Sequence, residues 1–224
     1  MVTTTSESLE LIKSMVAPSL YRSRRWRTAA SVWLWLTAAA VAQGTETGVR
    51  SGQFEGLTLA VSENGLLVGE YLEVQGANPG KKCQFFLTGD VNSSDHSMVS
   101  WSSHSLPGKI TAEPKGVVLK IPRGRTHDGC GLVLPPEISE GLFLSLIKIE
   151  PWIALRTVTA KRAYFHNQPD RKERQRAYVV AGDTLQVRAQ QQDWLQVDFV
   201  KGARKHTGWM LAADSRTVAS PTSR

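Results

Sequence analysis

Short runs of β-branched, aromatic and aliphatic residues fill the chain from Gln53 to Glu150, and glycine, proline, asparagine and aspartate separate them. Such runs between turn residues are typical of β-strands, and few stretches keep the 3.6-residue period of a helix. We therefore expect strands at residues 57–61, 66–74, 83–88, 98–101, 109–111, 117–121 and 142–150.

Turn signals stand between these runs, at Glu63-Asn64-Gly65, Asn78-Pro79-Gly80, Gly89-Asp90 and Pro114-Lys115-Gly116. Short antiparallel strands that follow one another with such turns form either a small closed barrel or a two-sheet sandwich. Within residues 66–74, alternation places four apolar side chains on one face around Glu70, namely Leu66, Val68, Leu72 and Val74.

A second series of strand signals begins after Pro151-Trp152, which divides the folded chain into residues 43–152 and residues 153–214. The segment 215–224 is rich in serine, threonine and alanine, and Val218 is its one large aliphatic residue. Chain ends of this composition fray because they bury little apolar surface. We predict that residues 215–224 form a disordered tail.

The N-terminal region has the order of a secretion signal. Four arginines between Arg22 and Arg27 precede residues 28–42, a stretch of 15 uncharged residues that ends in Ala40-Val41-Ala42. This stretch is shorter than the ~20 residues that cross a bilayer and ends in small residues that signal peptidase accepts. We predict that residues 1–42 are a signal peptide, with translation starting at Met1 or Met15. An uncleaved anchor and a buried core helix are the competing interpretations.

Charge narrows the choice of partner. The chain has 224 residues, with 27 Lys and Arg against 20 Asp and Glu, a net charge of +7. Removal of residues 1–42 takes away five basic and two acidic residues, leaving 22 against 18. This small excess lacks the clustered stripe of a nucleic-acid binder, so we expect no nucleic-acid partner. Membrane contact is expected only through the signal segment before cleavage.

The C-terminal region carries a set of motifs whose order and spacing resemble those of a bacterial Src-homology-3-like domain. They cover residues 157–214 and include Ala163-Tyr164-Phe165-His166, Gly182-Asp183, Trp194-Leu195-Gln196-Val197 and Gly208-Trp209-Met210. The first of them departs from the family, which usually has Leu-Asn-Val-Arg there. The resemblance implies a small barrel, so the predicted fold class is all-β, an antiparallel N-terminal barrel or sandwich followed by a small Src-homology-3-like barrel.

Aromatic residues of this module are the candidates for ligand binding. Alternation turns Tyr164 and His166 away from the side taken by Ala163 and Phe165, and Trp194 points outward from its own strand. Small barrels bind peptides through exposed aromatic surfaces. We predict four binding residues, with core packing as the competing interpretation for both tryptophans: Tyr164, His166, Trp194 and Trp209. The charged segment 170–176 is interpreted as a solvated loop.

The two cysteines bear on chemistry as well as on stability. Cys130 follows His127 by three residues, which raises the hypothesis of a thiolate nucleophile. Exported chains with two cysteines more often oxidise them. We therefore predict a disulfide between Cys83 and Cys130, and we predict no catalytic residue, no metal ligand and no cofactor.

These observations favour a non-enzymatic binding protein in the periplasm or outside the cell. Its expected partner is a cell-envelope peptide or protein. A close variant of the Src-homology-3-like module accompanies domains that resemble lysozyme inhibitors, so inhibition of a cell-wall hydrolase, or immunity against one, is the alternative. A cysteine peptidase acting on peptidoglycan through Cys130 is a third hypothesis.

Overall fold

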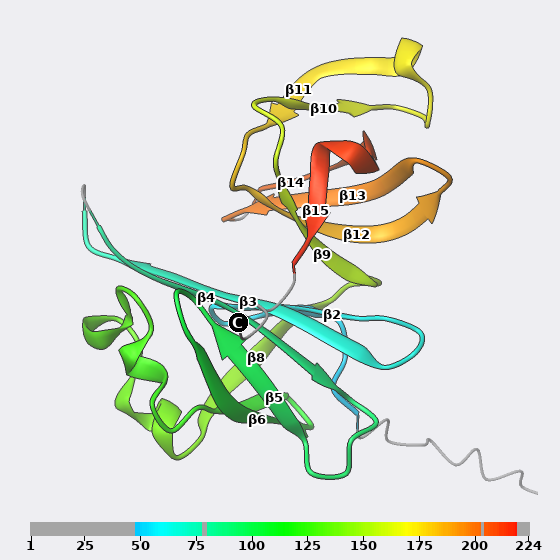
Figure 1. The fold of residues 1–224 in the computed structure, drawn as a ribbon. Coiled ribbons are helices and arrows are strands. Elements are labelled where there is room, and N and C mark those ends of the chain that lie inside the picture. Colours follow the sequence, from blue (N-terminus) through cyan, green and yellow to red (C-terminus); the bar gives the residue numbers. More distant parts are fainter. Residues whose placement is uncertain (1–47, 78–79, 203, 219–224) are drawn as a thin grey trace, which may run out of the picture. The chain divides into compact units, whose positions relative to one another are not determined.

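The computed structural model describes residues 48–77, 80–202 and 204–218, which all belong to one compact unit, residues 45–224 (Figure 1). The predicted signal peptide at residues 1–42, with its two candidate start sites, lies outside the described residues. In the part of the chain that the structure describes, no helix is long and apolar enough to cross a membrane.

The first eight strands form a closed antiparallel barrel, in which each strand pairs with its neighbour in the sequence. The barrel closes where β1 pairs with β8 through Gly52 and Ile149. The all-β prediction is confirmed, and of the two predicted architectures the barrel is the one observed. The strands are β1 (Gly52–Phe54), β2 (Leu57–Val61), β3 (Leu66–Gln75), β4 (Lys81–Asp90), β5 (Ser97–Trp101), β6 (Ser105–Glu113), β7 (Gly116–Lys120) and β8 (Leu142–Ile149).

Alternation along each strand fills the interior of the barrel. In β4, Cys83, Phe85 and Leu87 are completely buried, whereas their neighbours are partly exposed. In β3 the inward residues include Leu67 and Tyr71, which are almost fully buried. The face around Glu70 therefore points out of the barrel, and three of its apolar residues are 43% to 60% exposed: Leu66, Leu72 and Val74.

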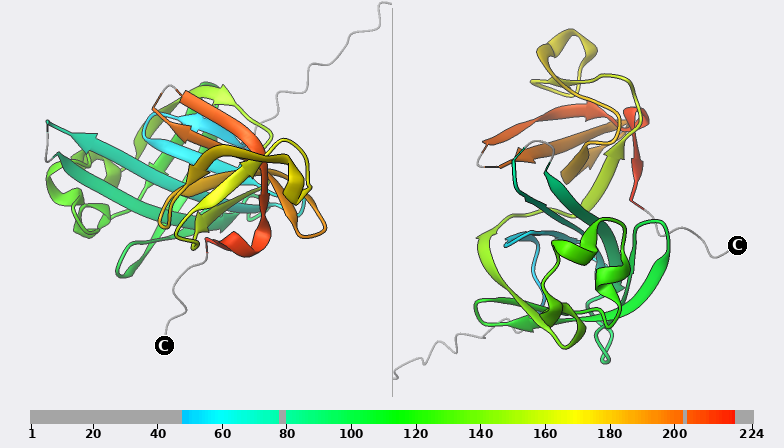
Figure 2. Two further views of the ribbon diagram at one scale, coloured as in Figure 1. Left: turned by 90° about the horizontal axis from the view of Figure 1, so that it is seen from above. Right: turned by 90° about the vertical axis from the view of Figure 1, so that its left-hand side faces the viewer.

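Three short 3-10 turns connect β7 to β8 and lie side by side (Figure 2). They are η1 (Gly124–Thr126), η2 (Cys130–Leu132) and η3 (Pro136–Ser139). The predicted disulfide is confirmed, since Cys130 at the start of η2 is bonded to Cys83 of β4. The disulfide thus attaches the 3-10 segment to the barrel wall.

The remaining strands form a second, seven-stranded antiparallel sheet in the order β11-β10-β14-β13-β12-β9-β15. Two further 3-10 turns, η4 (Arg171–Glu173) and η5 (Ala212–Asp214), precede β11 and β15. The strands are β9 (Ala154–Val158), β10 (Ala163–His166), β11 (Arg174–Val179), β12 (Thr184–Gln191), β13 (Trp194–Lys201), β14 (Arg204–Leu211) and β15 (Ser215–Thr217).

Two boundaries in this sheet correct the sequence prediction. The charged segment 170–176 is not wholly a loop, because β11 begins at Arg174 and alternates outward and inward side chains from there. The predicted tail begins too early, because Ser215–Thr217 pairs with β9 and Val218 is 8% exposed. Arg156 of β9 holds this segment by donating hydrogen bonds to Ser215 and Thr217. Local composition missed these contacts because the partner strand lies about sixty residues away.

A buried polar network holds the segment between the two sheets. Trp152 is 1% exposed, and its indole Nε1 donates a 2.8 Å hydrogen bond to the Asp198 carboxylate on β13. Arg188 and Lys205 form ion pairs with both Asp198 and Glu150. Buried carboxylates are stable as anions only when they are paired, and Arg188 and Lys205 provide that pairing. Because Glu150 shares these partners with Asp198 of β13, to which Trp152 also donates, the contacts hold the segment against the second sheet.

Candidate binding face

Four residues stand opposite one another across four strands of the second sheet. Trp209 on β14 pairs with Gln196 on β13 and with His166 on β10, and His166 pairs in turn with Arg174 on β11. Residues directly opposite on antiparallel strands point to the same face. Phe165, the chain neighbour of His166, is in the core, so this row lies on the outer face of the sheet.

His166 and Trp194 are in direct contact on this face. Their ring centroids lie 4.8 Å apart, and the rings meet edge to face at 77°. His166 is only 5% exposed, and its Nδ1 atom has no hydrogen-bond partner among the described residues. The imidazole thus points away from the core, as predicted. It is not exposed, however, because Trp194 packs against the ring. Trp194 and Trp209 are themselves half-buried.

Tyr164 forms a second aromatic contact, with Tyr178 rather than with Trp194. The two tyrosines are directly opposite on β10 and β11, with ring centroids 5.6 Å apart. The guanidinium of Arg174 lies 4.7 Å from the centre of the Tyr164 ring, and that of Arg162 lies 4.9 Å from the centre of the Tyr178 ring. At these distances a guanidinium is attracted to the ring face. Tyr178 is 45% exposed.

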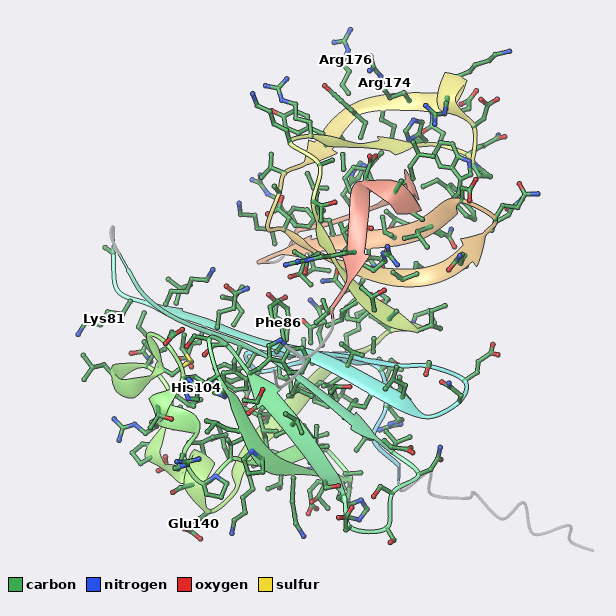
Figure 3. All side chains as sticks on the ribbon, in the orientation of Figure 1. Lys81, Phe86, His104, Glu140, Arg174 and Arg176 are labelled. Atoms are coloured by element: carbon green, nitrogen blue, oxygen red, sulfur yellow. A yellow bond between two sulfur atoms is a disulfide. The ribbon has the colours of Figure 1, made fainter. Side chains whose placement is uncertain are left out.

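We refer to this surface as the aromatic–basic face. It combines the four predicted binding residues with four that sequence analysis did not select; the complete set is Tyr164, His166, Trp194, Trp209, Tyr178, Arg162, Arg174 and Arg176. The missed signal is the alternation of Arg174, Arg176 and Tyr178 with smaller residues, which is the period of a strand. Figure 3 shows Arg174 and Arg176 projecting from β11.

The charge on this face is positive and unpaired. Residues 161–176 contain six Lys and Arg against two acidic residues. Within the described residues, no carboxylate lies within 4.0 Å of Arg162, Arg174 or Arg176. The face therefore combines ring surfaces with guanidinium groups that are available to an anionic partner.

His127, by contrast, is a buried residue that helps to pack the barrel. His127 is 2% exposed, stacks on Phe85 with centroids 4.8 Å apart, and hydrogen-bonds to Ser100 and Ser102 through its two ring nitrogens. Burial, together with the nearby His104, lowers the pKa of His127 to about 4. A histidine that stays neutral and fully hydrogen-bonded contributes to packing of the barrel.

Cys130 is bonded to Cys83 and so offers no thiolate, which removes the chemical basis of the cysteine-peptidase hypothesis in this oxidised form. Across the described ranges, no cluster of three or more His, Cys, Asp or Glu side chains is arranged to hold a metal ion.

Comparisons with protein-family models, with curated proteins and with solved structures found no match to this chain.

Proposed function

We propose that this chain is an exported, non-enzymatic binding protein whose second sheet is a Src-homology-3-like module. The module contacts a cell-envelope peptide or protein through the aromatic–basic face. The observation that carries the proposal is the contact between the exposed Tyr178 and the half-buried Tyr164, flanked by arginines that have no carboxylate partner in the described residues. Binding surfaces are enriched in tyrosine, tryptophan and arginine of this kind.

Two features support export. Residues 1–42 carry a basic segment, an uncharged stretch and an Ala-x-Ala end in the order that signal peptidase recognises. The Cys83–Cys130 disulfide is compatible with an oxidising compartment such as the periplasm or the cell exterior.

The Src-homology-3-like assignment is supported by where the family motifs fall. The Ala163–His166 motif forms β10, Trp194 begins β13, and the Gly208-Trp209 step lies in β14. Gly182 has a φ of +94°, which a tight turn before β12 requires and glycine adopts without strain. Gly208 approaches Phe165 so closely that a Cβ there would lie 3.1 Å from its ring, which explains the glycine before Trp209.

Matched variants test the proposal. Tyr178 on the face and Phe143 on β8 of the barrel are aromatic side chains with nearly equal exposure, 45% and 47%. Proteins captured from envelope extract by the wild-type chain are identified, and the affinity of the main one is measured for Tyr178→Ala and Phe143→Ala. We expect Tyr178→Ala to weaken binding at least fivefold, since truncation of an interface aromatic is costly, and Phe143→Ala to bind as the wild type does.

Equal binding by wild type and Tyr178→Ala would place the interaction elsewhere and contradict the proposal. The alternative function is inhibition of a cell-wall hydrolase, and it is tested by an assay of cell-wall lysis by purified hydrolases with and without the protein. Inhibition of lysis that survives Tyr178→Ala would favour a hydrolase inhibitor that acts through another surface.

A further inference from the structure

We infer that the ligand of the aromatic–basic face is an extended acidic peptide that adds as a strand to the free edge of β11. This inference rests on the proposed function and specifies its ligand. The expected peptide runs antiparallel to β11, as every strand pair of this sheet does. It carries an aromatic or aliphatic side chain, followed two and four residues further on by carboxylates.

β11 lies at the edge of the second sheet, because β10 is its one partner in the strand order of the described residues. An edge strand offers backbone N–H and C=O groups to an added strand. Gln175 and Ala177 alternate with the outward residues and are half-buried, so the strand has distinct inner and outer faces. A peptide that pairs with this edge thus has a defined register of side chains.

The outward side chains of β11 are Arg174, Arg176 and Tyr178, and all three are exposed. Strand residues two apart project from the same face. Side chains of an added antiparallel strand that point to this face therefore meet the tyrosine and then the two arginines. An apolar side chain at the first of these positions complements the ring, and carboxylates at the next two complement the arginines.

The arginines are held in position and remain unneutralised. Arg174 lies over the Tyr164 ring at 4.7 Å, which restrains the guanidinium while its N–H groups stay available. The acidic residues nearby are engaged locally, since Asp170 accepts a hydrogen bond from the Lys172 N–H and Asp183 accepts one from the Val180 N–H. Glu173 accepts a hydrogen bond from the Asn167 side chain.

The spacing favours a peptide over an anionic polymer. A phosphate polymer requires positive charge but no backbone edge and no two-residue period. Here the cations and the exposed ring share one face of one edge strand, which matches the side-chain period of a paired strand. Carboxylate recognition by a guanidinium fork adds direction to this pairing.

Two labelled peptides of identical composition test the inference on the full chain. The first, Thr-Phe-Thr-Glu-Thr-Glu-Thr, places both carboxylates on one face when it is extended. The second, Thr-Phe-Thr-Thr-Thr-Glu-Glu, places them on opposite faces. Binding is measured by fluorescence anisotropy, and copies of the first peptide N-methylated at alternate residues test for backbone hydrogen bonds.

We expect the alternating peptide to bind at least fivefold more tightly than the block peptide, and one of the two N-methylated registers to abolish binding. Arg174→Gln and Arg176→Gln should each weaken binding about threefold, the scale of an exposed ion pair, and the double variant about tenfold. Arg216→Gln is the control, because Arg216 is an exposed arginine on β15 at the opposite edge of the sheet.

Equal affinity for the two peptides, or tighter binding of a polyphosphate of equal charge, would overturn the inference in favour of charge attraction alone. The absence of binding to either peptide would overturn it as well. In both cases the proposed function stands if Tyr178→Ala still loses its captured partner, so the two failures are distinguishable.

Discussion

The imidazole of His166 and the indole of Trp194 meet edge to face, with ring centroids 4.8 Å apart. This contact joins β10 to β13 across the intervening strand β14, where Trp209 stands opposite His166. Trp194 therefore has two roles, since it packs against a buried histidine and presents its remaining surface to solvent. The aromatic–basic face and the packing of the sheet therefore share this residue.

Trp194→Ala should reduce affinity for the captured partner at least tenfold, because truncation of a central aromatic anchor costs about 2 kcal/mol or more. Tyr164→Ala should have a smaller effect, since Tyr178 and Arg174 still cover that part of the face. Affinities are measured by calorimetry, with circular dichroism as the control for folding. Loss of the β-sheet spectrum in Trp194→Ala would show that its role is structural.

Removal of the disulfide should destabilise the barrel. Cys83 and Cys130 are 47 residues apart in sequence, and closure of a loop of that length is worth about 4 kcal/mol in the chain-entropy model. The Cys83→Ala/Cys130→Ala double variant should unfold at a clearly lower urea concentration than the oxidised wild type. The reduced wild type is the control and should resemble the variant. An unchanged midpoint would contradict this role.

Glu70 should make the protein less stable as the pH rises. Burial raises the pKa of this carboxyl, while hydrogen bonds from Gln84 and Thr184 and the charge of Lys82 act in the opposite direction. Because the folded state favours the neutral form, the contribution of Glu70 is greatest below its ordinary pKa and is lost as the pH rises through the folded-state pKa. Glu70→Gln should therefore melt at a higher temperature than the wild type at pH 7.5.

The difference between Glu70→Gln and wild type should shrink as the pH falls toward 4, which melting curves across this range will show. A glutamine variant that is less stable than the wild type at pH 7.5 would mean that the anion is the favoured form in the folded protein.

His127 should have the opposite pH signature. Its pKa is lowered from 6.5 to about 4, first by burial and then by His104. The folded state thus favours neutral imidazole, so stability is fully present above pH 6.5 and is lost as the pH falls from about 6.5 to about 4. His127→Gln should flatten the melting temperature in this window, whereas the exposed His104→Gln control should keep most of the slope. An unchanged slope in His127→Gln would rule out this assignment.

The sequence predicts individual strands well where hydrophobic alternation is undisturbed. The predicted strand at residues 57–61 is β2 itself, and residues 66–74 fall within β3. The strand predicted at 109–111 is one third of β6, because Pro107 and Gly108 lie inside the strand and resemble turn residues. β1 has only three residues, which are too few to show the period of a strand.

The sequence predicts the aromatic–basic face in part. Alternation correctly placed Phe165 in the core and His166 opposite it. The exposure of His166 was not predictable, because it depends on Trp194 from a strand that pairs with β14 rather than with β10. The run of charged residues at 170–176 predicts a loop, so the sequence does not place Arg174 and Arg176 on a strand.

Hydrogen–deuterium exchange of the full chain, with and without its captured envelope partner, tests the central claim most directly. If the aromatic–basic face binds the partner, protection should appear in β10 and β11 and around Trp194 and Trp209, while the β4–β7 wall of the barrel exchanges as before. Protection confined to the barrel strands, with exchange at Arg174–Val179 unchanged by the partner, would contradict it.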